Sequence, residues 1–408
     1  MPRTDLIERL AQRQAECTRN GLLRRLRTVE AIDSTRIVLG SKRLCSFASN
    51  DYLGLAAHPD LRQALTEAAR NWGVGATAAH LLGGHRVAHT ALQEELADWT
   101  GRERVLLYST GFMANLGVID ALLRRGERCV QDRLNHASLL DGARLAGARL
   151  IRYPHLDADG AARQLSRHID TPTLLASDGV FSMDGDIAPL PQLADLCIRH
   201  QATLLIDDAH GLGVLGPQGA GSLAAAGLEP TQVPILMATL GKALGVCGAF
   251  VAGSADLIEG LGQFSRTHIY TTAMPPALAA ASLAAVRLAR HADGYRERLQ
   301  QRIAQFRHGA RQLGLALLDS STPIQPLRVG AATTALAWSQ ALENAGFYVP
   351  AIRPPTVAQG QARLRVTLSA QHDPAEVEQL LDALAGLAHS AAPIVDSNRP
   401  VGPDANEI

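Results

Sequence analysis

The sequence predicts an α/β fold, in which a mostly parallel central sheet carries helices on both faces and a smaller α+β domain follows. Two observations support this prediction. Between about residues 58 and 290, short apolar runs alternate with segments of helical periodicity, as expected for parallel strands joined by crossover helices. From about residue 291, the pattern changes to a long arginine-rich helix, short strands and a closing helix near 374–389.

The composition indicates a folded chain and disfavours several protein classes. With 408 residues, 47% of them hydrophobic, the chain is long enough for a large core and two domains. Lys plus Arg and Asp plus Glu both number 39, so the basic excess expected of a nucleic-acid-binding protein is missing. No apolar run reaches the roughly 18 residues that a membrane span needs. The five cysteines form no CxxC pair, which disfavours a disulfide scaffold or a cysteine zinc site and suits a cytoplasmic protein.

The N-terminal part is predicted to contain one helix and an extended segment. Residues 5–28 show amphipathic periodicity and end in an arginine cluster, whereas residues 40–55 favour a strand, a turn and an extended stretch. The predicted division of the chain is 1–57 for this segment, 58–290 for the large α/β domain, 291–389 for the small α+β domain and 390–408 for a mobile tail.

Seven apolar runs in the large domain are predicted strands: residues 104–108, 128–132, 149–153, 173–178, 203–208, 234–239 and 247–253. Helical segments such as 186–200 lie between most of them. Ligands of an open parallel sheet bind at the carboxyl ends of its strands. The residues that directly follow each run are therefore the candidate functional residues.

Small residues follow two of these runs. Gly111 and Phe112 lie in a turn that opens an apolar helix, where free backbone amides could hold a phosphate, although an ordinary strand-to-helix turn has the same pattern. Ser182 lies in the turn after residues 173–178 and could either hydrogen-bond a ligand or cap a helix.

An acid and an imidazole lie at and just after the end of the run at 203–208. Asp207 and His210 could bind a metal, lie in a solvated turn, or place an acid on a heterocyclic nitrogen with the imidazole beside the same ring. Residues 211–216 match GxGxxG, but Pro217 and the glycines after it do not open a helix that could face a pyrophosphate. The pattern therefore disfavours a nicotinamide-dependent dehydrogenase.

Lys242 is one of only two lysines in the chain, and nearly all the positive charge comes from arginine. A lysine amine can act as a nucleophile and form a Schiff base, whereas a guanidinium cannot. Lys242 follows a strand and has Gly241 and Gly245 beside it, which leaves room for a bulky partner. Lys42, in a polar stretch, is interpreted as an ordinary surface residue. Gly241-Lys242 does not match a phosphate-binding loop, since Ala243 replaces the required Ser or Thr.

These features together fit one cofactor, pyridoxal 5'-phosphate. Lys242 would form the Schiff base, Asp207 would keep the pyridine nitrogen protonated, and the turn at Gly111 would hold the phosphate. No metal is expected.

Eight ordered segments, which extend over nearly the whole chain from about residue 22 to 389, support this interpretation: SNDYLGL (49–55), TGFMANLGV (110–118), NHASLLDG (135–142), VFSMDGD (180–186), IDDAHGLGVLG (206–216), TLGKALG (239–245), IYTTAMPP (269–276) and AIRPPTV with ARLRVTLSA (351–357, 362–370). In this order they resemble the α-oxoamine synthases, acyltransferases that share the aspartate-aminotransferase fold (fold type I of the pyridoxal-phosphate enzymes).

The resemblance implies roles for individual residues around the cofactor. Lys242 would carry it, Asp207 would pair with the pyridine nitrogen and His136 would stack on the ring. His210 and Ser182 would contact the pyridoxal oxygen. Lys242, His136, Asp207 and His210 are the residues expected to be catalytic. The expected phosphate contacts are Thr239 and the amides of Gly111 and Phe112.

The resemblance also implies substrates and a partner. IRPPTV and AHLLGGH most resemble the family member of biotin biosynthesis, which implies L-alanine and either pimeloyl-CoA or pimeloyl-acyl carrier protein. Asn50 and Arg365, with His136, would bind the amino acid, and Arg24 and Thr356 would lie along the acyl chain. Family members are homodimers with the active site at the interface, and residues 269–272 would reach the partner's site. Neither a nucleic acid nor a membrane is an expected partner.

Other members of the family use the same core residues, so glycine C-acetyltransferase, 5-aminolevulinate synthase and serine palmitoyltransferase stay open as alternatives. An inactive regulatory subunit of the same fold is a further alternative. The presence of Lys242 argues against it, because such a subunit need not keep this lysine. Two features depart from the family pattern. The loop 75–84 has fewer glycine and serine residues than in many relatives, so no role in closing the active site is assigned to it. At position 178 an Asp replaces the longer Glu of the family.

Overall fold

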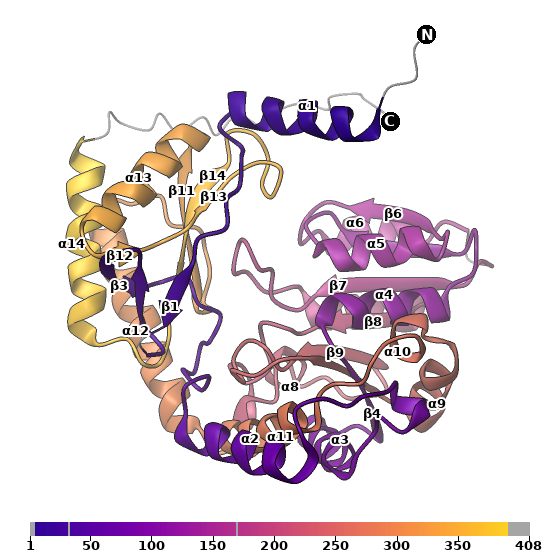
Figure 1. The fold of residues 1–408 in the computed structure, drawn as a ribbon. Helices are drawn as coiled ribbons and strands as arrows, with labels where there is room; N and C mark the ends of the chain where they lie inside the picture. Colours follow the sequence, from indigo (N-terminus) through magenta and orange to yellow (C-terminus); the bar gives the residue numbers. More distant parts are fainter. Residues whose placement is uncertain (1–4, 32, 169, 391–408) are drawn as a thin grey trace.

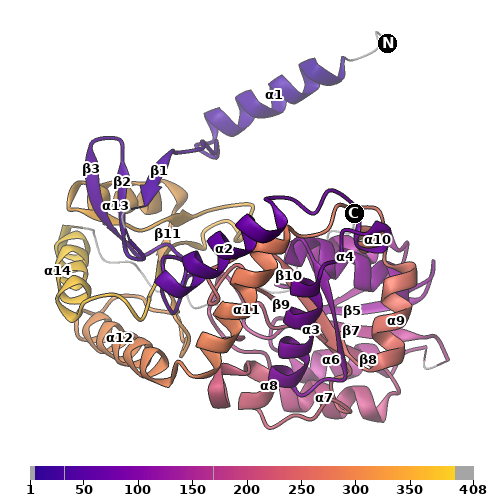
Figure 2. The same cartoon turned by 60° about the horizontal axis from the view of Figure 1, so that its bottom comes forward.

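The computed structural model describes residues 5–31, 33–168 and 170–390. The predicted tail after Ser390 lies outside these residues. A large body formed around one sheet carries a smaller body beside it, and helix α1 (Leu6–Arg19) projects away from both (Figures 1 and 2). The fold class predicted from the sequence is confirmed.

The central sheet has seven strands in the order β4-β10-β9-β8-β7-β5-β6. Their bounds are β4 (Arg104–Tyr108), β5 (Arg128–Asp132), β6 (Arg149–Tyr153), β7 (Thr173–Asp178), β8 (Thr203–Asp207), β9 (Ile235–Thr239) and β10 (Ala249–Gly253). Strand β10 runs antiparallel to β4 and β9, and the other neighbouring strands are parallel. The carboxyl ends of β4, β9, β8, β7 and β5 therefore share one edge.

Both faces of this sheet are buried. Successive residues along a strand, such as Leu204 and Leu205, belong to two different hydrophobic clusters. This burial on both sides explains why the strands appear in the sequence as continuous apolar runs. Helices α4 (Gly111–Leu122), α5 (Ala137–Leu145) and α9 (Ala255–Phe264) cover one face. The other face is covered by α2 (Pro59–Trp72), α3 (Val87–Thr100), α6 (Ala158–Leu165), α7 (Leu190–Arg199), α8 (Ser222–Ala225) and α11 (Pro276–Arg290).

The C-terminal part has its own sheet, β11-β14-β13, formed by β11 (Ile324–Gly330), β13 (Ala351–Ile352) and β14 (Ala362–Thr367). Its helices are α12 (Asp293–Gln312), α13 (Ala332–Asn344) and α14 (Pro374–Ser390). The N-terminal strands β1 (Val29–Ala31), β2 (Arg36–Leu39) and β3 (Lys42–Ser46) join it through β12 (Phe347–Tyr348), which pairs in parallel with β3. Residues 29–46 are thus joined to the C-terminal part.

The prediction of a helix over residues 5–28 is wrong in its length. Helix α1 ends at Arg19, where Asn20 caps it and Gly21 adopts a left-handed conformation with φ of 66°. The arginine cluster lies in the extended segment beyond. Within the described residues, no helix combines the length and the apolarity that crossing a membrane requires.

Candidate active site

The register of the central sheet brings the predicted site residues to one edge. Asp178 at the end of β7 lies directly opposite Asp207 at the end of β8. Ala249 of β10 pairs with Tyr108 on one side and with Thr239 on the other. The turns that follow β4, β7, β8 and β9 therefore lie next to one another.

Lys242 lies in the turn after β9, with its Nζ 2.7 Å from Nε2 of His210. Burial lowers the pKa of its amine to about 8, although the carboxylates of Asp207 and Asp178 act in the opposite direction. Among the described residues, no carboxylate oxygen lies within 4.0 Å of this amine. Lys242 is thus a partly buried amine that loses its proton at a lower pH than an ordinary lysine does, and the neutral amine is the nucleophilic form.

His210 is only 7% exposed and makes contacts through both ring nitrogens. Its Nδ1 lies 2.6 Å from the hydroxyl of Tyr52, and its Nε2 faces Lys242. Burial and the nearby charge of Lys242 hold the pKa of His210 well below its usual value. The imidazole is therefore neutral, and each nitrogen acts either as donor or as acceptor.

Asp207 is held in place by donors on both oxygens. Its Oδ2 accepts a 2.7 Å hydrogen bond from Nδ2 of Asn115, and its Oδ1 accepts one of 3.1 Å from the amide of Ala209. Asn115 also donates to Oγ of Ser138 at 2.9 Å. The roles of Asn115 and Ser138 were not predicted, since the only sequence signal was their place in the segments 110–118 and 135–142. Among the described residues, no group of three or more His, Cys, Asp or Glu side chains is placed to hold a metal ion.

His136 caps helix α5, and its Nδ1 lies 2.7 Å from Oγ of Ser138. Its ring is exposed and meets Phe112 edge-on, at 6.3 Å between centroids. Its backbone amide donates to Oδ2 of Asp178 at 2.9 Å. Burial and the nearby Asp207 hold the pKa of Asp178 well above its usual value. The shorter acid that replaces the family's Glu thus positions the start of α5.

Helix α4 begins at Gly111, as expected for a phosphate site. Thr110 caps it by accepting a hydrogen bond from the amide of Met113, and the first helical backbone bond runs from Ala114 to Thr110. The amides of Gly111 and Phe112 precede this bond and are available to a ligand. Thr239, across the sheet, donates to the carbonyl of Gly248 at 2.9 Å. The phosphate contacts expected of Gly111, Phe112 and Thr239 stay a prediction.

Arg365 is a buried guanidinium whose partners are all neutral oxygens. Its Nη2 donates to Oδ1 of Asn50 at 3.1 Å, its Nη1 to Thr367 at 2.9 Å and its Nε to the backbone carbonyl of Ser182 at 2.6 Å. In the part of the chain that the structure describes, Arg365 forms no salt bridge. It is therefore a buried cation suited to a carboxylate ligand. For Ser182, the contact runs through the backbone, and the predicted role of its hydroxyl stays untested.

Arg24 and Thr356 lie next to each other at the surface. Nη2 of Arg24 donates to Oγ1 of Thr356 at 3.0 Å, and Nη1 of Arg353 donates to the carbonyl of Gly21. Arg24 lies in the extended segment after α1 and not on the helix. Two residues 332 positions apart in sequence thus contact each other, and their place along the acyl substrate stays a prediction.

Two other sequence patterns have structural explanations. The GxGxxG match at 211–216 is followed by a short 3-10 turn (Pro217–Gly219) and by the four-residue helix α8, so no long helix faces a pyrophosphate. Lys42 pairs with Glu343 at 3.2 Å, as an ordinary surface lysine does.

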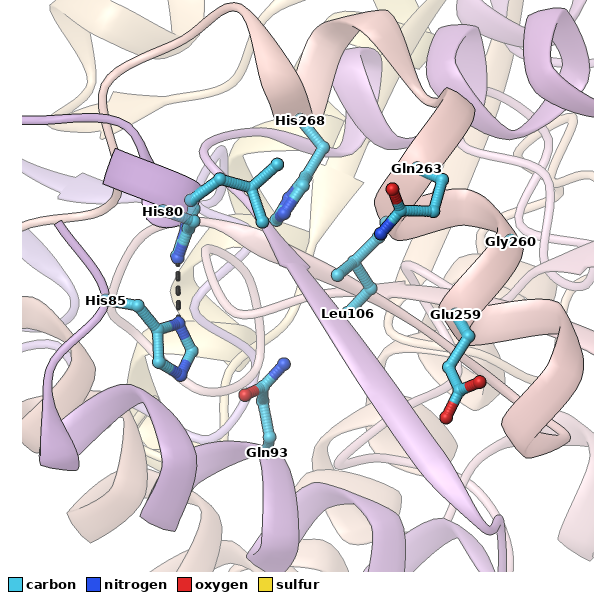
Figure 3. Close-up of a pocket in the computed structure, with 10 residues that line it drawn as sticks. His80, His85, Gln93, Leu106, Glu259, Gly260, Gln263 and His268 are labelled. Carbon is cyan, nitrogen blue, oxygen red and sulfur yellow. Dashed lines mark hydrogen bonds between the residues drawn. The ribbon is translucent and has the colours of Figure 1, made fainter. Parts of the chain in front are cut away.

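The loop 75–84 forms a 3-10 turn (His80–Leu82) in a cluster of imidazoles. Nδ1 of His80 lies 3.0 Å from Nδ1 of His85, and the ring of His268 stacks on His80 at 4.9 Å (Figure 3). A cavity of about 510 Å³ lies beside the cluster, between this loop and helix α9. None of its lining residues belongs to the predicted cofactor or substrate contacts.

This chain is similar to known proteins over nearly its whole length. Residues 42–384 match the family described as aminotransferase class I and II. An 8-amino-7-oxononanoate synthase from Xylella fastidiosa (strain M23) is 52% identical over 97% of this chain and 100% of its own length. One from Thioalkalivibrio sulfidiphilus is 55% identical over 93% of this chain and 96% of its length.

Solved structures show the same fold. A serine palmitoyltransferase from S. paucimobilis with bound PLP and myriocin has a TM-score of 0.90 at 29% identity and covers 95% of this chain and 99% of its own. The 8-amino-7-oxononanoate synthase from Francisella tularensis has a TM-score of 0.75 at 28% identity, over 85% of this chain and 98% of its own.

Proposed function

Because the chain belongs to the class I and II aminotransferase family and, within it, to the 8-amino-7-oxononanoate synthases, we propose that it condenses L-alanine with a pimeloyl thioester. The products are 8-amino-7-oxononanoate, CO2 and the free thiol, and the reaction serves biotin biosynthesis. The chain is thus a pyridoxal 5'-phosphate-dependent acyltransferase. The observation that carries this proposal is the partly buried amine of Lys242 beside His210, at the edge of the sheet that also presents Asp207.

The residues at this edge fit pyridoxal 5'-phosphate by the chemistry of their side chains. Lys242 offers an amine for the aldehyde, and among the described residues it forms no salt bridge. Asp207, oriented by Asn115, offers a carboxylate for the pyridine nitrogen, and the first amides of α4 offer donors for the phosphate. The exposed face of His136 is available for the ring.

The protein supplies positions and protons for the reaction. Pyridoxal phosphate, when bound, supplies the electron sink that allows alanine to lose its Cα proton and the product to lose CO2. Lys242, with a pKa lowered by burial to about 8, can take and return a proton at alanine Cα near neutral pH. Asp207 keeps a proton on the ring nitrogen, because the hydrogen bonds from Asn115 and Ala209 fix its carboxylate.

Arg365 and Asn50 bind the carboxylate of alanine in this proposal. The support is that Arg365, 5% exposed, has only neutral oxygens as partners, so that a carboxylate would satisfy an otherwise unpaired cation. Arg24 and Thr356 lie along the acyl donor, whether its thiol belongs to coenzyme A or to an acyl carrier protein. Their hydrogen bond joins two exposed segments to which a long substrate has access.

We also propose a homodimer with the active site at its interface, located in the cytoplasm. The apolar side chains of Val74, Leu82 and Tyr270 are 84%, 80% and 73% exposed. Their segments adjoin, since the amide of Ala273 donates to the carbonyl of Ala78. Exposed apolar residues grouped in this way favour a protein interface. Five free cysteines suit a reducing compartment.

The substrate pair tests the proposed function. Alanine with pimeloyl-CoA is expected to exceed glycine with acetyl-CoA in kcat/KM by at least about a hundredfold, because several additional methylenes are buried at about 0.8 kcal/mol each. Release of free thiol and of CO2 measures both reactions. If the glycine and acetyl-CoA pair is faster, the chain is another α-oxoamine synthase, such as a glycine C-acetyltransferase.

A further inference from the structure

The hydroxyl of Tyr52 connects two groups of residues in the proposed site. This side chain is fully buried, and its Oη lies 2.6 Å from Nδ1 of His210 and 3.2 Å from Oδ1 of Asn50. His210 contacts Lys242 through its other nitrogen, and Asn50 accepts from Arg365. One phenol therefore lies between the amine and the pair proposed to bind the carboxylate.

The contacts allow two arrangements of protons. In the first, Tyr52 donates to Asn50, so Nδ1 of His210 must carry the imidazole proton and donate to Oη. Nε2 is then an acceptor, and it faces Lys242 as the ammonium form.

In the second arrangement, Tyr52 donates to Nδ1 of His210. The imidazole proton is then on Nε2, which donates to Lys242 as the neutral amine. Oδ1 of Asn50 then no longer accepts from Tyr52 and still accepts from Arg365. The two arrangements differ in total by one proton, which Nζ of Lys242 releases to solvent. The imidazole proton of His210 moves from Nδ1 to Nε2 by exchange with solvent, and the hydroxyl of Tyr52 rotates from Asn50 to His210.

We propose that Tyr52 is a positioning residue that couples the tautomer of His210, and the donor to Asn50, to the protonation of Lys242. The inference rests on the proposed function only in assigning this coupling to the alanine-binding steps. Through Tyr52, the group that moves the Cα proton and the group that binds the carboxylate respond to each other.

The surrounding charges act on this unit from several elements. Lys242 is faced by Asp207, Asp178, Asp208 and Arg365, and His210 is faced by Lys242, Arg365 and His136. The hydroxyl of Tyr52 is faced by Arg365. The variant Tyr52→Phe changes none of these groups. It removes only the hydroxyl and keeps the buried ring, so any change in the coupling is due to the hydroxyl.

The test is 15N NMR of histidine-labelled full-length protein freed of cofactor, between pH 6.5 and 9.5. In the wild type, His210 is expected to change from the Nδ1–H to the Nε2–H tautomer as Lys242 loses its proton near pH 8. In Tyr52→Phe, a mixture of tautomers that responds weakly to pH is expected. Tyr108→Phe is the control, because it removes a buried hydroxyl that donates to Ser265. If Tyr52→Phe shows the wild-type tautomer change, the proposal is overturned.

Kinetics of the loaded enzyme supply a second measurement. Tyr52→Phe is expected to lower kcat roughly tenfold and to raise KM for alanine, with KM for the pimeloyl thioester unchanged, because one buried hydrogen bond is lost. An equal rise in both KM values would mean that Tyr52 only supports the fold and would overturn the proposal. If the wild type shows the tautomer change but turns over alanine with neither pimeloyl-CoA nor pimeloyl-acyl carrier protein, the proposed function fails and the coupling stands.

Discussion

At the scale of single residues, the proposed chemistry depends on which groups can lose a proton. Lys242 has its pKa lowered to about 8, since burial outweighs the attraction of Asp207 and Asp178. His210 beside it stays neutral. An amine in this environment reaches its neutral, nucleophilic form at a lower pH than an ordinary lysine does, whereas Lys42 lies near the surface and pairs with Glu343.

Lys242→Arg keeps the positive charge but removes the amine. The variant is expected to fold, to lose the yellow colour of the bound cofactor and to lose all turnover, because a guanidinium does not condense with an aldehyde. Visible absorbance after purification and reduction with borohydride measure this. Lys42→Arg is the matched control. A yellow and active Lys242→Arg protein would contradict the role of Lys242.

Asn115→Ala tests the orientation of Asp207. The variant removes the donor to Oδ2 of Asp207, so turnover is expected to fall by about ten- to a hundredfold, in line with about 1–3 kcal/mol for a buried hydrogen bond. Cofactor content, measured from absorbance, is expected to change little. Asn344→Ala, at an exposed position, is the control. Unchanged turnover in Asn115→Ala would mean that the amide of Ala209 alone holds Asp207.

The residues that sequence patterns missed share one property. Asn115, Ser138 and Tyr52 act by contacting other side chains, and each has a partner that is distant in sequence. Lys242 and Asp207, by contrast, each follow an apolar run, and the rule for the ends of parallel strands identifies such positions directly. Sequence pattern and resemblance together predict the residues that are proposed to react, such as Lys242 and Asp207. The residues that orient them can be identified only from the three-dimensional structure.

At the scale of elements, the turn after β7 is held by an ion pair on each side of His155. Its Nδ1 lies 3.0 Å from Asp132 and its Nε2 lies 2.9 Å from Asp186, and its ring meets Phe181 edge-on. Burial lowers the pKa of His155, but the two carboxylates overcome this effect and raise the pKa to about 10. The turn that carries Ser182 is thus fixed to the end of β5.

His155→Gln is expected to lose about 2 kcal/mol of stability at pH 6, a value typical of charge-assisted hydrogen bonds. Because the pKa of His155 is higher in the folded than in the unfolded protein, its contribution is complete below about pH 6.5 and is lost as the pH rises through about 10. Thermal unfolding between pH 6 and 10.5 measures this, with His200→Gln as control. A gap in Tm that stays constant with pH would contradict the ion-pair account.

The segment after α1 is an element that the hydrophobic periodicity misassigned. The periodicity of residues 5–28 continues past Gly21, but the left-handed conformation of Gly21 ends the helix, and Arg24 then contacts Thr356. Strands were predicted to within about two residues because they are buried on both faces. The antiparallel direction of β10 could not be predicted, since an apolar run does not encode its direction.

Arg24→Ala tests the acyl site proposed at this segment. KM for the pimeloyl thioester is expected to rise about tenfold, while KM for alanine stays unchanged, because Arg24 lies at Thr356 and away from Arg365 in the contacts described. Arg25→Ala, at a neighbouring exposed arginine, is the control. An equal effect of both variants would indicate a general charge effect.

At the scale of the whole molecule, the exposed apolar residues of the loop 75–84 and of the segment 269–272 are proposed to lie at the dimer interface. Leu82→Arg is expected to shift the protein from dimer to monomer and to lower turnover, since a charge in an apolar interface costs several kcal/mol. Light scattering after size exclusion measures the mass. The control is Leu6→Arg on the projecting helix α1. A monomeric wild type with full activity would contradict this proposal. The division of the chain into domains, which was predicted from the sequence, stays a prediction.

The pairing of β3 with β12 has a consequence for the order in which the chain can fold during synthesis. Cys45 lies opposite Phe347, so the first sheet of the molecule closes only when a segment about 300 residues later has been made. At roughly 5–20 residues per second, this leaves the N-terminal strands waiting for about 15–60 s on the ribosome. During that time the edge of β3 that later pairs with β12 has free backbone N–H and C=O groups. A chaperone that binds unpaired strand edges would act at this stage.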